Sequence, residues 1–304
     1  MRLTILGGYL GAGKTTWLRH QLFSGALSDA VVLVNEAART PVDDALLKSV
    51  SCVLSGGCAC CDGRADMIAA LRDLADQKSQ GRALAHVVLE TSGLADPGAI
   101  IAAVQDDPVL VHHVRFDPIR VVVDALHGLA QLRDEPLARR QVASADILTL
   151  TKCDSASPVE LARLVATLRS LNPDADLGFS ELGRDVAPPD LPDARPEVLP
   201  HLAEEGPPPV PMRLTVPPGT DWSALSVWLS ALLHARGDDL VRVKGVVRTP
   251  AGRLLLQTVR RIVQRPEILP EDSAAQDNVL IFIGRGFTHD ELERSFARFV
   301  LGED

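Results

Sequence analysis

Short apolar runs alternate with segments of helical periodicity through the first 171 residues. The runs are typical of strands that are buried on both faces of a parallel sheet. They are Arg2–Leu6, Ala30–Val34, Ser51–Ser55, Val87–Glu90, Ile119–Val123 and Asp146–Leu150. Helical spacing of apolar residues marks Trp17–Phe23, Asp66–Gln77, a segment opened by Pro97, and Pro158–Leu171. This β–α alternation predicts an α/β domain with a doubly wound, mainly parallel sheet.

The pattern changes after a stretch in which prolines recur, residues 186–211, which we predict to be an extended linker. A strand at Arg213–Val216 is followed by a helix from Trp222 that Gly237 closes. Further strands are expected at Leu240–Val247, Arg253–Val259, Ile262–Arg265 and Val279–Ile283. Thr288 and Glu291 form a capping box that opens a last helix with Leu292, Phe296 and Phe299 on its buried face. We therefore predict an α/β domain over residues 1–185 and a smaller α+β domain over residues 212–304.

Net charge, hydropathy and cysteine content exclude several classes of protein. The chain of 304 residues has a net charge of −9, so a nucleic-acid surface is not expected, and the partners should be small molecules or proteins. No apolar run approaches the length that spans a bilayer, and no signal peptide opens the chain, so we expect a cytoplasmic protein without a membrane partner. Five cysteines, three of them within four positions, indicate reduced thiols for metal or redox chemistry rather than a disulfide framework.

The loop after the first strand has the sequence of a phosphate-binding loop. Gly8, Gly13, Lys14 and Thr15 fit the pattern G-x-x-x-x-G-K-[ST], and it lies between a strand and a helix, as such loops require. Backbone N–H groups there converge on a phosphate, the lysine adds a positive charge, and the Thr15 hydroxyl is placed for Mg²⁺. The nucleotide-binding residues predicted here are Gly8, Gly11, Ala12, Gly13, Lys14, Thr15 and Thr16. The alternative is a plain glycine turn.

Two later strand ends carry chemistry that suits a guanine nucleotide. Thr151-Lys152-Cys153-Asp154 resembles the base-recognition pattern N-K-x-D of GTPases, with Thr151 in place of asparagine. Asp154 would accept hydrogen bonds from guanine, and Lys152 would lie along the base. Glu90 looks like the acid that holds Mg²⁺, and Gly93 like the glycine that senses the γ-phosphate. The alternatives are a surface carboxylate at Glu90 and an incidental pair of charges after the later strand.

The thiol cluster points to a second metal. Cys58, Cys60 and Cys61 supply three soft ligands, whereas a closed structural zinc site takes four protein ligands, so an open position is implied. Zinc and cobalt are the candidates, although softness alone would admit copper(I). Buried inert cysteines, a redox pair, and a structural site completed by a distant residue remain alternatives. The adjacent His112 and His113 are interpreted as loop or helix-end residues rather than ligands.

These motifs together resemble the CobW-type proteins, among the P-loop GTPases that include the hydrogenase and urease nickel-insertion factors. The likeness rests on G-C-x-C-C at residues 57–61, E-T-S-G-x-A-D-P at residues 90–97, a strand ending in Asp124-Ala125, and Q-x-x-x-A-D at residues 141–146. It continues through Leu171-Asn172-Pro173 and, after the linker, into Trp228 and the segment Arg242-Val243-Lys244-Gly245.

The resemblance implies a GTPase that binds GTP or GDP with Mg²⁺, holds zinc or cobalt, and delivers that metal to a client metalloenzyme or cofactor-assembly protein. It gives Lys14, Thr15 and Glu90 catalytic roles, with Thr15 and Glu90 as Mg²⁺ ligands. Glu36 joins the thiols as a ligand of the transition metal. A homodimer that depends on nucleotide or metal is also expected. The first mobile loop departs from the family's N-E-F-G-E, because Ala38 and Arg39 replace the glycine and the second acid.

Two other function classes fit parts of the pattern. A small-molecule kinase or ATPase would use the same phosphate loop, but Asp154 speaks against adenine and no lid motif is evident. A regulatory GTPase switch would dock a protein through its C-terminal domain and use the cysteines as a structural zinc clip.

Overall fold

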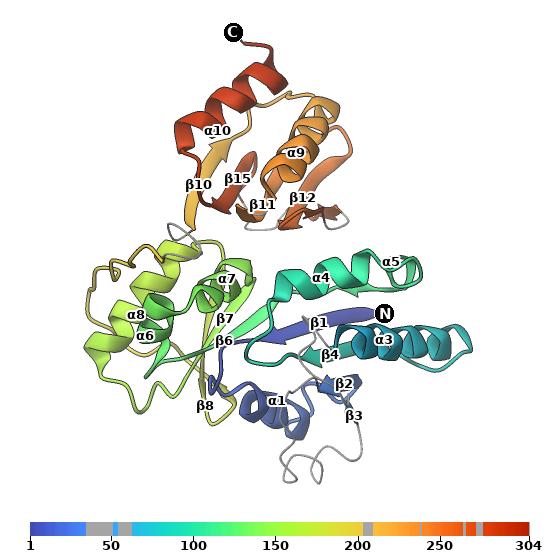
Figure 1. Ribbon diagram of the computed structural model, residues 1–304, viewed down its shortest axis with the longest axis vertical. Coiled ribbons are helices and arrows are strands. Elements are labelled where there is room, and N and C mark those ends of the chain that lie inside the picture. Colours follow the sequence, from blue (N-terminus) through green and yellow to red (C-terminus); the bar gives the residue numbers. More distant parts are fainter. Residues whose placement is uncertain are drawn as a thin grey trace. The chain divides into compact units, whose positions relative to one another are not determined.

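The computed structural model describes residues 1–34, 51–53, 63–202, 209–237, 239–263, 266–271 and 276–303. It divides into two compact units. The first comprises Met1–Arg169 and Ala175–Val198, and the second comprises Ser170–Asp174 and Leu199–Asp304. Each unit is built around its own sheet (Figure 1). The predicted domain limits, with a linker at residues 186–211, stay a prediction.

The first unit has a sheet in the order β3-β2-β4-β1-β6-β7-β8-β9, with β5 paired to β1. All these pairs are parallel except β8 with β9. The strands are β1 (Arg2–Gly7), β2 (Ala30–Val34), β3 (Ser51–Val53), β4 (His86–Glu90), β5 (Arg115–Phe116), β6 (Arg120–Asp124), β7 (Ile147–Thr151), β8 (Asp176–Glu181) and β9 (Arg184–Val186). Because β1 lies between β4 and β6, the loop that follows β1 sits where the strand order reverses, which is where such sheets bind ligands.

Helices connect these strands. They are α1 (Lys14–Phe23), α3 (Arg64–Ser79), α4 (Pro97–Gln105), α5 (Leu110–His113), α6 (Gly128–Asp134), α7 (Pro136–Ser144) and α8 (Pro158–Leu171). Helix α1 packs through Trp17 and Leu18 on the buried strand residues Val32, Val88 and Val122. Asp96 caps α4 by accepting a hydrogen bond from the Gly98 N–H, and Pro97 occupies its first turn. The predicted α/β class with a mainly parallel sheet is confirmed.

The second unit has an antiparallel sheet in the order β10-β15-β11-β12-β13, with β14 paired to β12. Its strands are β10 (Val210–Thr215), β11 (Leu240–Thr249), β12 (Gly252–Val259), β13 (Ile262–Val263), β14 (Glu267–Leu269) and β15 (Val279–Gly284). Helices α9 (Trp222–Arg236) and α10 (His289–Phe296) bury Trp228 and Phe296 against Phe282 of the sheet. The rings of Trp228 and Phe296 meet edge to face at 5.3 Å. The predicted α+β class of this smaller domain is confirmed.

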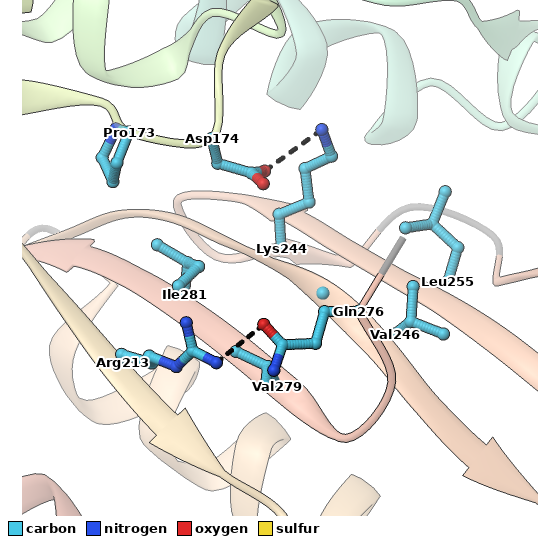
Figure 2. Close-up of a pocket in the computed structure, with 10 residues that line it drawn as sticks. Pro173, Asp174, Arg213, Lys244, Val246, Leu255, Gln276, Val279 and Ile281 are labelled. Carbon is cyan, nitrogen blue, oxygen red and sulfur yellow. Dashed lines mark hydrogen bonds and ion pairs between the residues drawn. The ribbon is translucent and has the colours of Figure 1, made fainter. Parts of the chain in front are cut away.

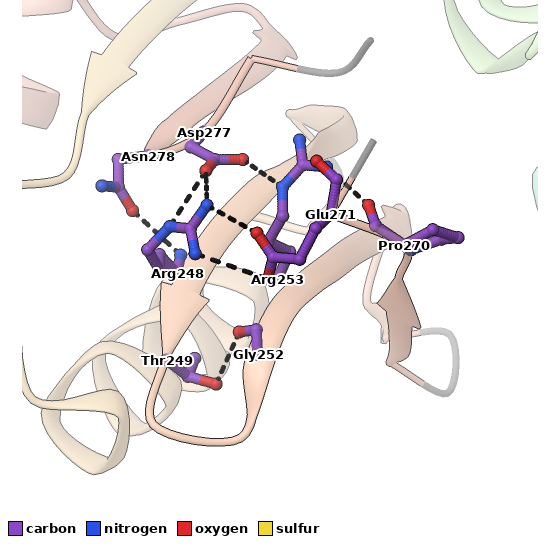
Figure 3. Close-up of polar contacts among 8 residues, drawn as sticks. All are labelled: Arg248, Thr249, Gly252, Arg253, Pro270, Glu271, Asp277 and Asn278. Carbon is purple, nitrogen blue, oxygen red and sulfur yellow. Dashed lines mark hydrogen bonds and ion pairs between the residues drawn. The ribbon is translucent and has the colours of Figure 1, made fainter. Parts of the chain in front are cut away.

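A buried arginine holds the end of the β11–β12 hairpin (Figure 3). Arg253 Nε donates to Asp277 Oδ1 at 2.6 Å, and its Nη1 donates to the Pro270 carbonyl at 2.7 Å. Arg248 Nη2 donates to the second Asp277 oxygen at 2.7 Å. The hydrogen bond from Arg253 is the largest cause that lowers the pKa of Asp277. This network fastens the hairpin to the segment before β15, which accounts for it as a structural feature.

Of three predicted details of the second unit, one is confirmed and two differ in the structure. The capping box of Thr288 and Glu291 is present. The prediction that Phe299 is buried is wrong: its side chain is 69% exposed, because α10 passes into a π-helical turn at Ala297–Leu301 that changes the helical periodicity. Gly237 does follow α9, but with φ −63°, so it is not a left-handed cap. A Cβ there would lie 2.0 Å from Arg261 Cγ, so close packing requires the glycine.

Regular structure reaches into both ends of the predicted linker. Strand β9 ends at Val186, β10 begins at Val210, and residues 187–201 form no helix or strand. Helices α6 and α7 and the β8–β9 hairpin were not predicted, since their sequences lack a clear apolar period. Among the helices in the described ranges, none is long and apolar enough to cross a membrane.

Candidate nucleotide-binding site

The backbone of the loop between β1 and α1 requires glycine. Gly8, Gly11 and Gly13 have φ values of 140°, 74° and 92°, which side chains with a Cβ rarely adopt. At Gly8 a Cβ would also lie 2.4 Å from the Val122 carbonyl oxygen of β6. The loop therefore turns sharply against the sheet and presents the first N–H groups of α1, and N–H groups at a helix N-terminus are donors of the kind that bind anions.

Lys14 folds back over this loop. Its side chain is buried, and Nζ donates to the carbonyl oxygens of Gly8 at 3.0 Å and Tyr9 at 3.4 Å. These contacts fix a positive charge beside the N–H groups of α1. A phosphate placed there would meet both the charge and the donors.

Thr15 and Glu90 come from different elements and meet at the sheet edge. Glu90 ends β4, which pairs with β1 in the register Leu6 to Glu90. Its carboxylate is buried, and the Thr15 hydroxyl donates to Glu90 Oε1 at 2.5 Å. A hydroxyl oxygen and a carboxylate are hard oxygen ligands of the kind that Mg²⁺ takes. The structure thus brings together the two residues that the sequence predicts as Mg²⁺ ligands.

The segment after β4 lies directly against the phosphate loop. A Cβ on Gly93 would stand 2.8 Å from both the N and the Cα of Leu10, so only glycine allows this approach. Gln141 of α7 fixes the same segment, because its Nε2 donates to the carbonyl oxygens of Gly93 at 3.2 Å and Ala95 at 2.8 Å. Gln141 was not among the predicted site residues. The motif Q-x-x-x-A-D contained the signal, but it gave no role to this side chain.

The predicted base motif is joined to the phosphate loop by two hydrogen bonds. The Thr151 hydroxyl donates to the Ala12 carbonyl oxygen at 2.7 Å. Lys152 has φ 58°, and its Nζ donates to the Gly11 carbonyl oxygen at 2.9 Å. The threonine that stands in place of asparagine therefore links β7 to the loop after β1.

Asp124, at the end of β6, neutralises Lys152. Its buried carboxylate accepts from Lys152 Nζ at 2.7 Å, His127 Nδ1 at 2.9 Å and the Leu126 N–H at 2.8 Å. Burial opposes ionisation of Asp124, but the hydrogen bonds from Lys152, His127 and Leu126 outweigh it and lower its pKa. The Asp-Ala strand end has no function predicted from the sequence. The structure makes Asp124 the residue that orients Lys152.

Asp154 is exposed just beyond the carboxyl end of β7, at the same edge of the sheet. Its neighbour Cys153 has a pKa raised to about 11, first by burial and then by the charges of Asp154 and Glu181. Glu181 ends β8, so this strand forms a further part of the edge. The β8–β9 turn packs closely on α1, since a Cβ on Gly183 would lie 2.5 Å from the Thr16 carbonyl oxygen.

The predicted transition-metal ligands, Cys58, Cys60, Cys61 and Glu36, lie outside the described residues, as do Ala38 and Arg39. Within the described part of the chain, one group of three potential donors lies within 4.8 Å, and all its members are exposed: His289, Asp290 and Glu293. His112 and His113 end the short helix α5, as expected for helix-end residues.

Comparison with known proteins identifies two family domains. Residues 2–178 match the CobW/HypB/UreG nucleotide-binding domain, and residues 212–300 match the cobalamin synthesis protein cobW C-terminal domain. The chain is 30% identical to the zinc chaperone YjiA of Escherichia coli, over 97% of each chain. It is 31% identical to the zinc chaperone CobW of Pseudomonas aeruginosa, over 55% of this chain and 52% of that protein.

Two further similarities concern a eukaryotic relative and a solved fold. A zinc-regulated GTPase metalloprotein activator of Schizosaccharomyces pombe is 32% identical over 56% of this chain and 43% of its own. The crystal structure of zinc-bound YjiA GTPase from E. coli has a similar fold, with a TM-score of 0.67 and 24% identity over 98% of each chain. The chain therefore belongs to the CobW/HypB/UreG family and is a P-loop GTPase with a CobW-type C-terminal domain.

Proposed function

We propose that this GTPase is a metallochaperone that binds zinc at Cys58, Cys60 and Cys61, with Glu36 as a further ligand, and delivers the ion to a client metalloenzyme or cofactor-assembly protein. Relatives that are named zinc chaperones and zinc-regulated GTPase metalloprotein activators support this function. The three closely spaced thiols suit a soft or borderline metal. We favour zinc over cobalt because those relatives are named for zinc.

The hydrogen bond of 2.5 Å between Thr15 and Glu90 is the structural observation that carries the GTP-dependent part of the proposal. It joins a hydroxyl and a carboxylate, two hard oxygen groups that could hold a Mg²⁺ ion, and such an ion would neutralise nucleotide phosphates. Lys14 and the N–H groups of α1 would stabilise the charge that develops on the transferred phosphoryl group. The base motif supplies the guanine contact through Asp154, in line with the family's use of GTP.

The segments that carry Glu36 and the thiols follow two strands, β2 and β3, whose last residues are level with Glu90 in the sheet. Glu90 of β4 pairs with Val34 of the neighbouring strand β2, and Val34 in turn pairs with Val53 of β3. Glu36 follows Val34 by two residues, and Cys58 follows Val53 by five. A nucleotide that reorganises these loops could therefore change the metal ligands directly.

The experiment is a set of zinc affinities for the full chain with Mg-GTP, with Mg-GDP and without nucleotide. Zinc should bind at least about tenfold more tightly with Mg-GTP, because only a difference in affinity between nucleotide states can couple hydrolysis to release. Cys60→Ala should abolish that difference. Cys153→Ala, at a cysteine outside the thiol cluster, is the control, and it is measured at saturating nucleotide because Cys153 lies in the base motif.

Equal zinc affinity in all three nucleotide states would contradict the proposed coupling. Retention of the metal against a chelator in every state would favour a structural zinc clip instead. Parallel titrations with cobalt(II) and copper(I) establish the metal preference. Light scattering in the same three states tests the predicted nucleotide- or metal-dependent homodimer.

A further inference from the structure

The sheet of the second unit has two different faces. One face packs on the helices through residues such as Val243, Leu280 and Phe282. The alternate positions of the same strands point to the opposite face, where a pocket of about 340 Å³ opens (Figure 2). This volume is at the lower end of the range of about 300–1,000 Å³ that is usual for small-molecule sites.

The floor of this pocket is apolar. Val246, Leu255, Val279 and Ile281 line it from β11, β12 and β15, and Leu255 and Ile281 are only half-buried. Covering such surface contributes roughly 25 cal/mol per Å². The body of a ligand in this pocket is therefore apolar.

Two positively charged side chains flank Ile281 on the two strands that pair with β15. The strand register pairs Ile281 with Arg213 of β10 and with Lys244 of β11. Neighbouring strands lie about 4.8 Å apart, so the backbones that carry the two cations are roughly 10 Å apart. Figure 2 shows both side chains at the rim of the apolar floor.

Their partners distinguish the two cations. Lys244 Nζ pairs with Asp174 Oδ2 at 3.1 Å, which balances its charge. Arg213 Nη2 donates to the neutral amide oxygen of Gln276 at 2.8 Å. Asp174, Lys244 and Arg213 are the charged residues of the lining, and together they leave one net positive charge. This charge lies on Arg213, whose planar guanidinium suits a carboxylate.

From these features we propose that the pocket binds a small organic monoanion, a carboxylate with an apolar body. The carboxylate binds Arg213, and the apolar body covers Val279 and Ile281. The Lys244–Asp174 pair forms the opposite wall. No lining residue of this pocket is among the described nucleotide-site residues, and the proposal gives the second unit a ligand of its own.

The test uses octanoate as the probe and octanol, of equal chain length, as its neutral counterpart. Isothermal titration is performed on the full chain saturated with Mg-GDP, so that the phosphate site does not contribute. Octanoate should bind one site per chain. Octanol should bind at least about tenfold more weakly, since a hydrogen bond to a charged group is lost. Equal affinities for octanoate and octanol would overturn the proposal.

Variants locate the site. Arg213→Met should weaken octanoate binding about tenfold, and Arg213→Lys should restore part of it, because the charge returns without the planar fork. Asp174→Asn should strengthen binding, because it releases Lys244 as a second cation. Arg298→Met, which changes an exposed arginine on the π-helical turn, is the matched control. Octanoate binding that survives Arg213→Met, or that changes equally in the control, would refute the assignment.

Discussion

At the scale of single residues, the nucleotide site depends on side chains that tie separate loops together. Thr151 and Lys152 donate to the carbonyl oxygens of Ala12 and Gly11, and Asp124 holds the lysine from a third strand. None of these bonds joins near neighbours in the chain. The base motif and the phosphate loop are consequently expected to respond together to substitution.

Thr151→Val tests this link, because valine has nearly the same shape as threonine but lacks the hydroxyl that donates to the Ala12 carbonyl. The buried Ala12 carbonyl would lose its side-chain partner, which costs about 1–3 kcal/mol of unfolding free energy. Affinity for GDP should fall about five- to tenfold, since Ala12 belongs to the phosphate loop. Urea unfolding and fluorescent-GDP titration measure the two effects. Thr151→Ser keeps the hydroxyl and should behave like the native chain; an unchanged GDP affinity in Thr151→Val would contradict the link.

Cys153 gives a prediction for reactivity. Burial, Asp154 and Glu181 raise its pKa to about 11. At pH 8 its thiolate fraction should be on the order of 100-fold smaller than that of an ordinary cysteine with a pKa of about 8.5. Iodoacetamide should therefore modify Cys153 far more slowly in the folded chain than in urea, as followed by mass spectrometry of its peptide.

Glu181→Gln should speed that reaction, because it removes one of the negative charges that disfavour the thiolate. Equal rates for Cys153 in the folded and unfolded chains would show that its surroundings do not suppress ionisation.

At the scale of elements, α7 and the β8–β9 hairpin shape the site from outside its motifs. Helix α7 reaches the segment after β4 through Gln141. The hairpin contacts α1 twice, with Gln21 Nε2 donating to the Gly183 carbonyl at 3.1 Å and Trp17 Nε1 donating to Asp185 at 3.0 Å. These elements hold the positions of the loops that would meet the nucleotide.

Gln141→Met should affect GTP more than GDP. Methionine has a similar length but cannot donate to the Gly93 and Ala95 carbonyls, so the segment predicted to sense the γ-phosphate loses two hydrogen bonds of about 1 kcal/mol each. The rate of GTP hydrolysis should fall about tenfold, with GDP affinity nearly unchanged. Gln131→Met, on α6, is the control. Equal losses for GTP and GDP would indicate a general structural role instead.

At the scale of the whole molecule, the described nucleotide-site residues all belong to the first unit, while the octanoate pocket belongs to the second. Ligands of the two sites should therefore stabilise different parts of the chain. The tryptophans allow these parts to be followed separately, because Trp17 lies in the first unit, and Trp222 and Trp228 lie in the second.

GDP at about 100 times its dissociation constant should stabilise the first unit by about 2.7 kcal/mol. In a chain that keeps only Trp17, the unfolding midpoint in urea should rise with GDP. In Trp17→Phe the fluorescence comes only from Trp222 and Trp228 of the second unit, and GDP should leave the unfolding midpoint unchanged. Equal shifts in both chains would mean that the two units unfold as one cooperative structure.

Most strands and most helices were predictable, since their signals are local. Continuous apolar runs identified β1, β2, β4, β6 and β7, and helical periodicity with proline and capping residues identified α4, α8 and α10. The β8–β9 hairpin and α7 were missed because their sequences lack a clear apolar period, and their positions follow from contacts with α1 and with the segment after β4. Phe299 was misplaced because a π-helical turn breaks the period on which the prediction depended.

The sequence by itself determined the fold class and the chemistry of the phosphate loop, because glycine spacing, Lys14 and the strand–helix context act within a few residues. Only the tertiary structure decided which distant side chains complete the site. Asp124 and Glu181 reach it through strand order and register, and Gln141 reaches it through the packing of α7 on the segment after β4. None of these arrangements is encoded at any one position. The same holds for the pocket of the second unit, where Arg213 and Lys244 become neighbours of Ile281 only once β10, β15 and β11 pair.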